Sequence, residues 1–398
     1  MFFKLLKKIP KEIRIIALFT SILYLGRWFF EAYLPIFLSS FANTHAETGM
    51  LKSIYDVIFF LVAPIAWYFA DRISAKKIIL LWLCCYPLIS LSYFFAGITY
   101  LAIFIVIARI INGFAYGTIA ASRQKLMYQF WEWEIGKSMW FFDSMTNRTW
   151  IIWVFISMIL VRRVPIHMLA LAIIPASVVA FFVAKRLPDT KKVSKHISLN
   201  FRIYLDIFKN IKRRDPKLRK LIFLWILITM VSASFYFFIP IEVYSQWHSL
   251  LEIWLLTICF TLPESLGLLF GRKIDVDHGR WFIRSCVAII ITLVLSLFMK
   301  YFVWYILAGI LIGVAIEIME LERHKLIAAL WNNGNYWEIN GIKVSMEEWV
   351  GMIFWPILIW LFMDIWGMQL WFAAMIVLII IILCIFSFSI LPAYANRK

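Results

Sequence analysis

Two oppositely charged residues lie within one strongly apolar stretch near the start of the chain. Arg27 and Glu31 stand in "GRWFFEAYLP", which begins at Gly26 and ends at Pro35. A spacing of four residues places both side chains on one face of a helix. Burial disfavours the charged form of a carboxylate and a nearby guanidinium favours it, so a changing distance between the two groups would change proton affinity. We expect Glu31 to carry protons; the alternative is a permanent salt bridge.

Other charged residues also interrupt apolar segments. An ionised side chain at the centre of a bilayer costs about 3 kcal/mol even on the lenient insertion scale, so such groups usually face partners or a cavity. We expect Asp56 to be the second proton carrier, with Arg109 and Arg27 as switching partners. Arg148 and Glu264 are expected to be charged partners in the same cavity, and a hydrogen bond to a neighbouring helix is the alternative for Glu264.

The composition is that of a polytopic membrane protein. Of 398 residues, 63% are hydrophobic and only 16% are charged, a balance that soluble globular domains do not normally show. The first apolar run, about 23 residues long, exceeds a signal-peptide core and is expected to be a retained span. All five cysteines lie in apolar segments, and the six histidines lie in connections or at segment ends. We therefore expect neither a metal nor another cofactor.

Apolar segments long enough to cross a bilayer as helices recur along the whole chain. We expect twelve membrane-spanning helices, at residues 15–38, 52–70, 78–97, 101–121, 138–161, 166–184, 221–243, 250–271, 281–299, 301–321, 348–366 and 369–392.

Lysine and arginine concentrate in alternate connections between these segments. The basic connections are 71–77, 122–137, 185–220, 272–280 and 322–347. The positive-inside rule therefore predicts that both termini lie in the cytoplasm, and the expected location is the plasma (inner) membrane of a bacterium or archaeon. The net charge is +17, and the charged residues lie mainly between the spans. This distribution favours a bilayer with anionic headgroups over nucleic acid as the partner.

The two halves of the chain resemble each other. "YLPI" at 33–36 is echoed by "FIPI" at 238–241, and "RQKL" at 123–126 is echoed by "RHKL" at 323–326. Internal repeats of this kind are typical of transporters. We expect an N-terminal six-helix bundle, a basic cytoplasmic linker with an amphipathic helix on the membrane surface, and a C-terminal six-helix bundle, at residues 1–184, 185–220 and 221–398.

The connection after the second span resembles a signature of the major facilitator superfamily, in which a glycine, three residues, Asp-Arg and a second glycine precede a basic cluster. In "WYFADRISAKK" the acidic and basic positions are present, whereas Trp67 and Ser74 replace the glycines. A copy in the second half keeps Gly271, Asp275, Gly279 and Arg280. The resemblance implies a cytoplasmic gate formed by Asp71, Arg72, Lys76, Glu134, Asp143, Asp275 and Arg280.

A second family pattern, an arginine in span four followed by small residues, is similar to Arg109, Asn112, Gly113 and Gly117; the last three are expected to line the cavity or to pack. The resemblance implies an all-α polytopic membrane protein with twelve transmembrane helices in two pseudo-symmetric six-helix bundles. It also implies a monomeric secondary transporter that works by alternating access on a small-molecule substrate.

The expected activity is proton-coupled efflux of a lipophilic or amphipathic small molecule, because a carboxylate in an aromatic cavity suits proton exchange for such compounds. Span five lacks the Gly-Pro-rich signature of many drug/proton antiporters, so uptake of a small polar solute, or flipping of a lipid headgroup, stays open. A polytopic membrane enzyme is disfavoured because no nucleophile, base or metal set is clustered. A receptor is disfavoured because the midplane charges would lack a purpose, although a fold alone does not guarantee transport.

Overall fold

A computed structural model describes most of the chain. The described residues are 9–72, 74–129, 163–189, 216–247, 279–298, 301–330 and 355–391, with shorter pieces at 142, 145–146, 156, 159–161, 252–253, 255–260 and 262–263. Every element assigned within these ranges is helical. The chain divides into two compact units, one comprising Met1–Phe41 and Ile54–Asn200, the other comprising Ala42–Ser53 and Phe201–Lys398.

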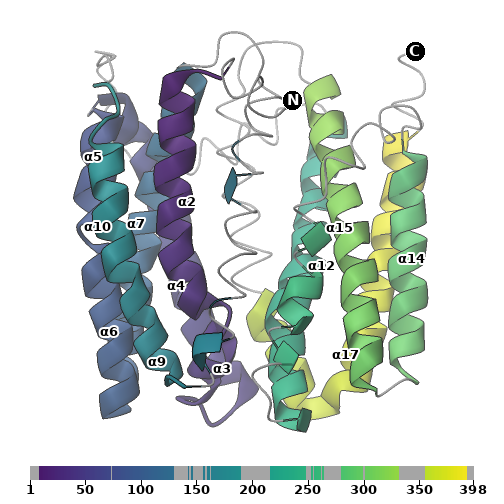
Figure 1. The fold of residues 1–398 in the computed structure, drawn as a ribbon. Coiled ribbons are helices and arrows are strands. Elements are labelled where there is room, and N and C mark those ends of the chain that lie inside the picture. Colours follow the sequence, from purple (N-terminus) through teal and green to yellow (C-terminus); the bar gives the residue numbers. More distant parts are fainter. Residues whose placement is uncertain are drawn as a thin grey trace. The chain divides into compact units, whose positions relative to one another are not determined.

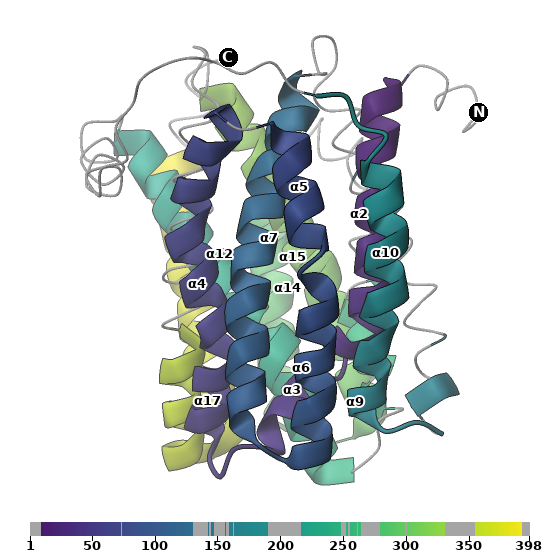
Figure 2. The same ribbon diagram turned by 90° about the vertical axis from the view of Figure 1, so that its left-hand side faces the viewer.

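The first unit is built from long, closely packed helices (Figure 1). Its elements are α2 (Lys11–Glu31), α3 (Leu34–Ser39), α4 (His45–Arg72, from Ile54 onwards), α5 (Ala75–Leu83), α6 (Tyr86–Thr99), α7 (Ala102–Gln129), α9 (Ile166–Leu169), the 3-10 turn η1 (Ala170–Ala172) and α10 (Ile173–Ala184). Helix α2 packs against α10, and α7 packs against α5 and α6, as Figure 2 shows from the side.

Prolines divide two of the expected spans of the first unit. Helix α2 ends at Glu31, four residues before Pro35, and α5 ends at Leu83, four residues before Pro87. A proline has no backbone N–H to donate to the carbonyl four residues earlier, and its ring clashes with that carbonyl. Each proline therefore starts a new helix, α3 or α6, and Glu31 lies at the last residue of α2.

The second unit is also helical. Its long elements are α12 (Pro216–Trp247), α14 (Arg280–Ser296), α15 (Phe302–Leu330) and α17 (Trp355–Ile385), which continues into the π-helical turn η3 (Phe386–Ile390). Helix α14 packs against α15 and α17, and α12 packs against α17 and α15.

One expectation about the second unit is corrected, and one proline behaves differently from its counterpart in the first unit. Pro240, the counterpart of Pro35, lies inside the continuous helix α12, within the span predicted at 221–243. The predicted boundary between spans 348–366 and 369–392 is wrong, because α17 continues across it. The sequence between these spans offers no proline, and a lone glycine costs a helix about 1 kcal/mol without removing a backbone hydrogen bond.

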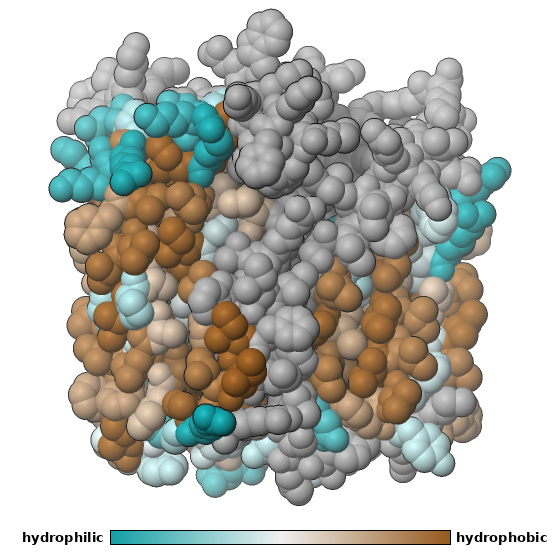
Figure 3. Space-filling view, viewed as in Figure 1, coloured by the Kyte–Doolittle hydropathy of each residue, from teal (hydrophilic) through white to brown (hydrophobic). Residues whose placement is uncertain are grey.

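The apolar character of the helices is consistent with a bilayer. Six helical segments in the described residues are long and apolar enough to cross a membrane: Lys11–Glu31, Ala75–Thr99 (α5 with α6), Ala102–Met127, Ile166–Ala184 (α9, η1 and α10), Phe302–Met319 and Leu370–Ile390. On the face of the first unit seen in Figure 3, apolar side chains cover the sides of the helices and hydrophilic ones gather at one end. The expected spans at 138–161 and 250–271, and the expected amphipathic helix of the linker, lie largely or wholly outside the described residues.

Gly26 and Gly113 are two of the glycines that allow unusually close helix contacts in the first unit. A Cβ atom at Gly26 of α2 would collide with the Cβ of Ala176 in α10 and lie 2.8 Å from the carbonyl oxygen of Ala172. A Cβ atom at Gly113 of α7 would lie 2.7 Å from the Cβ of Ile58 and 2.8 Å from the carbonyl oxygen of Tyr55 in α4. These contacts fix the packing of α2 on α10 and of α7 on α4.

Replacing Gly113 with alanine is expected to lower the free energy of unfolding by about 1–3 kcal/mol, because a backbone carbonyl blocks the added methyl group. Gly117→Ala is the matched control, since its nearest neighbour, a Val62 methyl, would lie 3.4 Å away. There the better helix propensity of alanine should leave stability unchanged or raise it by up to about 1 kcal/mol. Unfolding of both variants in mixed micelles, followed by circular dichroism, measures the difference; equal effects would contradict this packing.

Candidate functional site

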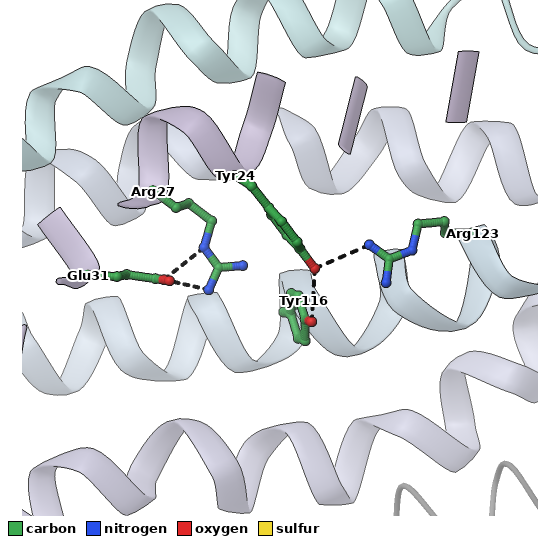
Figure 4. A network of polar contacts seen from close by, with 5 residues as sticks. All are labelled: Tyr24, Arg27, Glu31, Tyr116 and Arg123. Carbon is green, nitrogen blue, oxygen red and sulfur yellow. Dashed lines mark hydrogen bonds and ion pairs between the residues drawn. The ribbon is translucent and has the colours of Figure 1, made fainter. Parts of the chain in front are cut away.

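An ion pair lies at the end of α2. The Nε and Nη2 atoms of Arg27 donate to the same oxygen of Glu31, Oε1, at 2.8 and 2.5 Å (Figure 4). The side chain of Arg27 is 8% exposed and that of Glu31 is 20% exposed. The i,i+4 pair expected from the sequence is therefore present, and its guanidinium group is buried within the first unit.

Tyrosine rings surround the guanidinium group of Arg27. Its central carbon lies 5.0 Å from the ring centre of Tyr116 in α7, 5.8 Å from that of Tyr24 in α2 and 5.9 Å from that of Tyr86 in α6. The faces of aromatic rings attract cations, and this attraction strengthens when water is excluded. The rings thus stabilise the positive charge of Arg27 inside the helix bundle.

A second set of polar contacts lies beside this pair. The hydroxyl groups of Tyr24 and Tyr116 are 3.0 Å apart, and Nη1 of Arg123 donates to the Tyr24 hydroxyl at 3.3 Å (Figure 4). Arg123 is buried, and its guanidinium carbon lies 4.8 Å from the ring centre of Phe142. Helices α2 and α7 are therefore joined through side chains as well as through packing.

The contacts among these tyrosines and Arg123 were not predicted from the sequence, in which Arg123 stands out only as part of the repeated tetrapeptide at 123–126. A usable signal was present in α7. Asn112, Tyr116 and Arg123 follow Arg109 by three, seven and fourteen residues, which places all four on one face of a helix. A polar stripe on a helix that is otherwise apolar indicates a buried polar site rather than a lipid-facing surface.

Arg109 belongs to the same group of side chains. It is buried, and its guanidinium carbon lies 4.7 Å from the ring centre of Tyr55 in α4. The ring centre of Tyr55 lies 6.0 Å from that of Tyr116, the ring that also lies beside Arg27. The structure thus brings together both arginines and the carboxylate that the sequence analysis selected.

The other predicted cavity residues also lie in the first unit. Asp56 is buried on α4, next to Tyr55, and Asn112 is buried on α7, one turn from Arg109. Gly113 and Gly117 lie on the side of α7 that meets α4. Among the described residues, no group of three or more His, Cys, Asp or Glu side chains could hold a metal ion.

The predicted gate is only partly described. Asp71 and Arg72 lie in the last turn of α4, Lys76 lies in the first turn of α5, and the exposed Arg280 begins α14. The predicted residues Arg148, Glu264, Glu134, Asp143 and Asp275 lie outside the described residues.

Carboxylates that the sequence analysis did not select lie at the beginnings of two helices. Ser74, which precedes α5, donates its hydroxyl hydrogen to Oδ1 of Asp189 at 3.0 Å. Gly279, which precedes α14 with a φ of 79°, donates its N–H to Oε1 of the buried Glu322 at 3.3 Å. A negative charge at a helix N-terminus is favourable because it complements the helix dipole.

Comparisons with known proteins agree with this architecture. The family model described as Major Facilitator Superfamily matches residues 16–333. The crystal structure of the human organic anion transporter MFSD10 (TETRAN) superimposes with a TM-score of 0.68 at 16% identity, covering 95% of this chain and 100% of that chain. The nucleoside transporter NupG superimposes with a TM-score of 0.72 at 14% identity, covering 96% of this chain and 100% of that one. No curated protein matches the sequence significantly.

Proposed function

Because the chain belongs to the Major Facilitator Superfamily, we propose that this secondary transporter exchanges protons for a lipophilic or amphipathic small molecule, with efflux as the direction. Glu31 is the first proton carrier and Asp56 the second. The observation that carries the proposal is the ion pair between Glu31 and the buried Arg27. In a wholly structural pair, burial of two charges brings little stability, since desolvation offsets much of their attraction.

Protonation of Glu31 provides the coupling step. A neutral carboxyl group no longer attracts Arg27 as an ion, so the guanidinium group becomes available to other acceptors. Arg109 adjoins the same group of rings, because it lies beside Tyr55, whose ring is next to that of Tyr116. If the transporter has two conformations, a proton shifts the equilibrium toward the conformation that binds it more tightly. The size of the shift is set by the difference in proton-binding free energy between the two conformations.

The aromatic rings near the ion pair support the proposal of an amphipathic substrate. The ring centres of Phe59 and Tyr55 lie 5.5 and 6.0 Å from that of Tyr116, so apolar ring surface adjoins the charged groups. An alternative is uptake of a small polar solute, which is favoured by the buried Oδ1 of Asn112, an atom without a hydrogen bond to any described residue. The named neighbours, which transport organic anions and nucleosides, are compatible with either substrate class.

Transport by reconstituted protein tests this function. Purified protein in liposomes that contain a pH-sensitive dye is supplied with amphipathic compounds under an imposed pH gradient. The expected result is proton movement that depends on the compound and stops when an ionophore abolishes the gradient. Substrate movement that proceeds identically with and without the gradient would overturn proton coupling, and protein-free liposomes serve as the control.

The cytoplasmic gate residues are proposed to control the rate of the conformational change. Asp71→Asn, at the end of α4, is expected to slow transport about fivefold, because the carboxylate loses an interaction of about 1 kcal/mol with a helix terminus or a basic group. Equilibrium binding of the substrate should change little. Stopped-flow transport measures the rate, and binding titrations measure the affinity. An unchanged transport rate would contradict a role for Asp71 in the gate and would leave it only a role in fixing the orientation of the helices in the membrane.

A further inference from the structure

Arg27 has a buried hydrogen-bond donor that the ion pair does not use. Its Nε and Nη2 atoms both donate to Oε1 of Glu31, so the usual two-oxygen geometry of an arginine–carboxylate pair is absent. The third nitrogen, Nη1, is buried and makes no hydrogen bond to any residue that the structure describes. A buried donor without an acceptor is destabilising, and such a group in a folded protein requires an explanation.

The tyrosine pair beside it has a spare hydrogen as well. The hydroxyls of Tyr24 and Tyr116 share one hydrogen bond, which uses one of their two O–H hydrogens. Arg123 cannot accept the other, because a guanidinium group only donates. Whichever tyrosine donates within the pair, one hydroxyl hydrogen has no acceptor in the described part of the first unit.

These donors lie close together. The guanidinium carbon of Arg27 is 5.0 Å from the ring centre of Tyr116 and 5.8 Å from that of Tyr24. Figure 4 shows the third nitrogen of Arg27 pointing away from Glu31, on the side where the two tyrosines lie, with Arg123 beyond them. Two positive charges therefore flank a pair of hydroxyl groups, and Glu31 occupies only one side of one of these charges.

We propose that Arg27, Tyr24, Tyr116 and Arg123 form a site for the anionic group of the transported compound, and that the substrate is an organic anion: a carboxylate, sulfonate or phosphate on an apolar body. This rests on the proposed function as a transporter. An oxyanion accepts several hydrogen bonds and donates none, so it satisfies the unused donors of Arg27 and the tyrosine pair. A cationic compound adds donors and is repelled by both arginines.

Three probes with one skeleton and different charges test the proposal: 4-phenylbutyrate, its neutral amide and the cationic 4-phenylbutylamine. Binding to purified wild-type protein is measured by isothermal titration calorimetry and thermal stabilisation in detergent. The carboxylate is expected to bind at least about tenfold more tightly than the amide, since hydrogen bonds to a charged acceptor are stronger than those to a neutral one. Equal binding of carboxylate and amide, or no binding of any probe, would overturn the proposal.

Variants locate the site. Tyr116→Phe keeps the ring and removes the hydroxyl, so it should weaken carboxylate binding about tenfold and amide binding by a smaller factor. Tyr301→Phe is the matched control, because Tyr301 is 78% exposed in the second unit. Tyr24→Phe provides a second test should Tyr116→Phe fold poorly. Wild-type affinity for the carboxylate in a folded Tyr116→Phe or Tyr24→Phe protein would refute the site.

The titrations use no proton gradient, so their result is independent of coupling. Preferential carboxylate binding together with gradient-independent transport would reject the proposed proton coupling and retain the anion site. Proton-coupled transport together with equal binding of the carboxylate and the amide would reject the anion site and retain the proposed proton coupling.

Discussion

Glu31→Gln is expected to yield a folded protein that has lost proton-coupled transport. Glutamine has nearly the same shape as glutamate and can still accept hydrogen bonds from Arg27, but it cannot bind and release a proton. Substrate-dependent acidification of liposomes should therefore fall to the level of protein-free vesicles. Binding of the substrate at equilibrium should persist, because Glu31 is not required to contact it.

A second glutamate in the same helix provides the control for Glu31→Gln. Glu12 lies in the first turn of α2, at the opposite end from Glu31, and Glu12→Gln makes the same chemical change there. This variant should transport like the wild type. Proton movement that survives in Glu31→Gln would exclude Glu31 as the essential carrier and transfer the hypothesis to Asp56, for which Asp56→Asn is the corresponding variant.

Arg27→Met is also expected to have a large effect and to lower the free energy of unfolding by about 3 kcal/mol. Methionine removes the cation and both hydrogen bonds to Glu31, which leaves a largely buried carboxylate without its ionic partner. It also removes the cation from the tyrosine rings around it. Reversible unfolding in mixed detergent and SDS micelles measures the loss.

The double variant Arg27→Met/Glu31→Gln separates the loss of packing from the loss of charge pairing. Because the double variant contains no isolated charge at this position, it should recover more than half of the stability lost in Arg27→Met. If the double variant is no more stable than Arg27→Met, the pair contributes through side-chain packing and not through charge.

The ion pair could be predicted from the sequence because helix geometry alone determines which side chains four residues apart meet. The prediction that Arg109 lies near Arg27 was less direct. It rested on the cost of burying a charge in an apolar helix, which favours placing charged side chains together. The hydroxyl contact between Tyr24 and Tyr116 could not be predicted in this way. It joins residues 92 positions apart, and spacing within either helix does not specify the partner helix or its register.

The positions of the helix breaks were predicted only in part from the sequence. The rule that ends α2 and α5 before Pro35 and Pro87 is visible in the sequence, yet Pro240 stands inside the unbroken α12. A proline removes one hydrogen bond wherever it lies, but neighbouring helices decide whether the chain bends, breaks or continues. Apolar length likewise predicted two helices where α17 is continuous, since hydrophobicity alone does not mark a boundary.

The close contacts at Gly26 and Gly113 have a mechanical consequence. Rolling of α2 about its own axis, or sliding of α7 along α4, is expected to disturb these contacts. The contacts join two pairs of helices in the first unit, α2 with α10 and α4 with α7. The contacts of Tyr24 and Arg27 with Tyr116 cross the seam between these pairs. If protons or anions bind beside these contacts as proposed, we expect the bound charge to change the interaction between the two helix pairs and so to favour a displacement of one pair relative to the other.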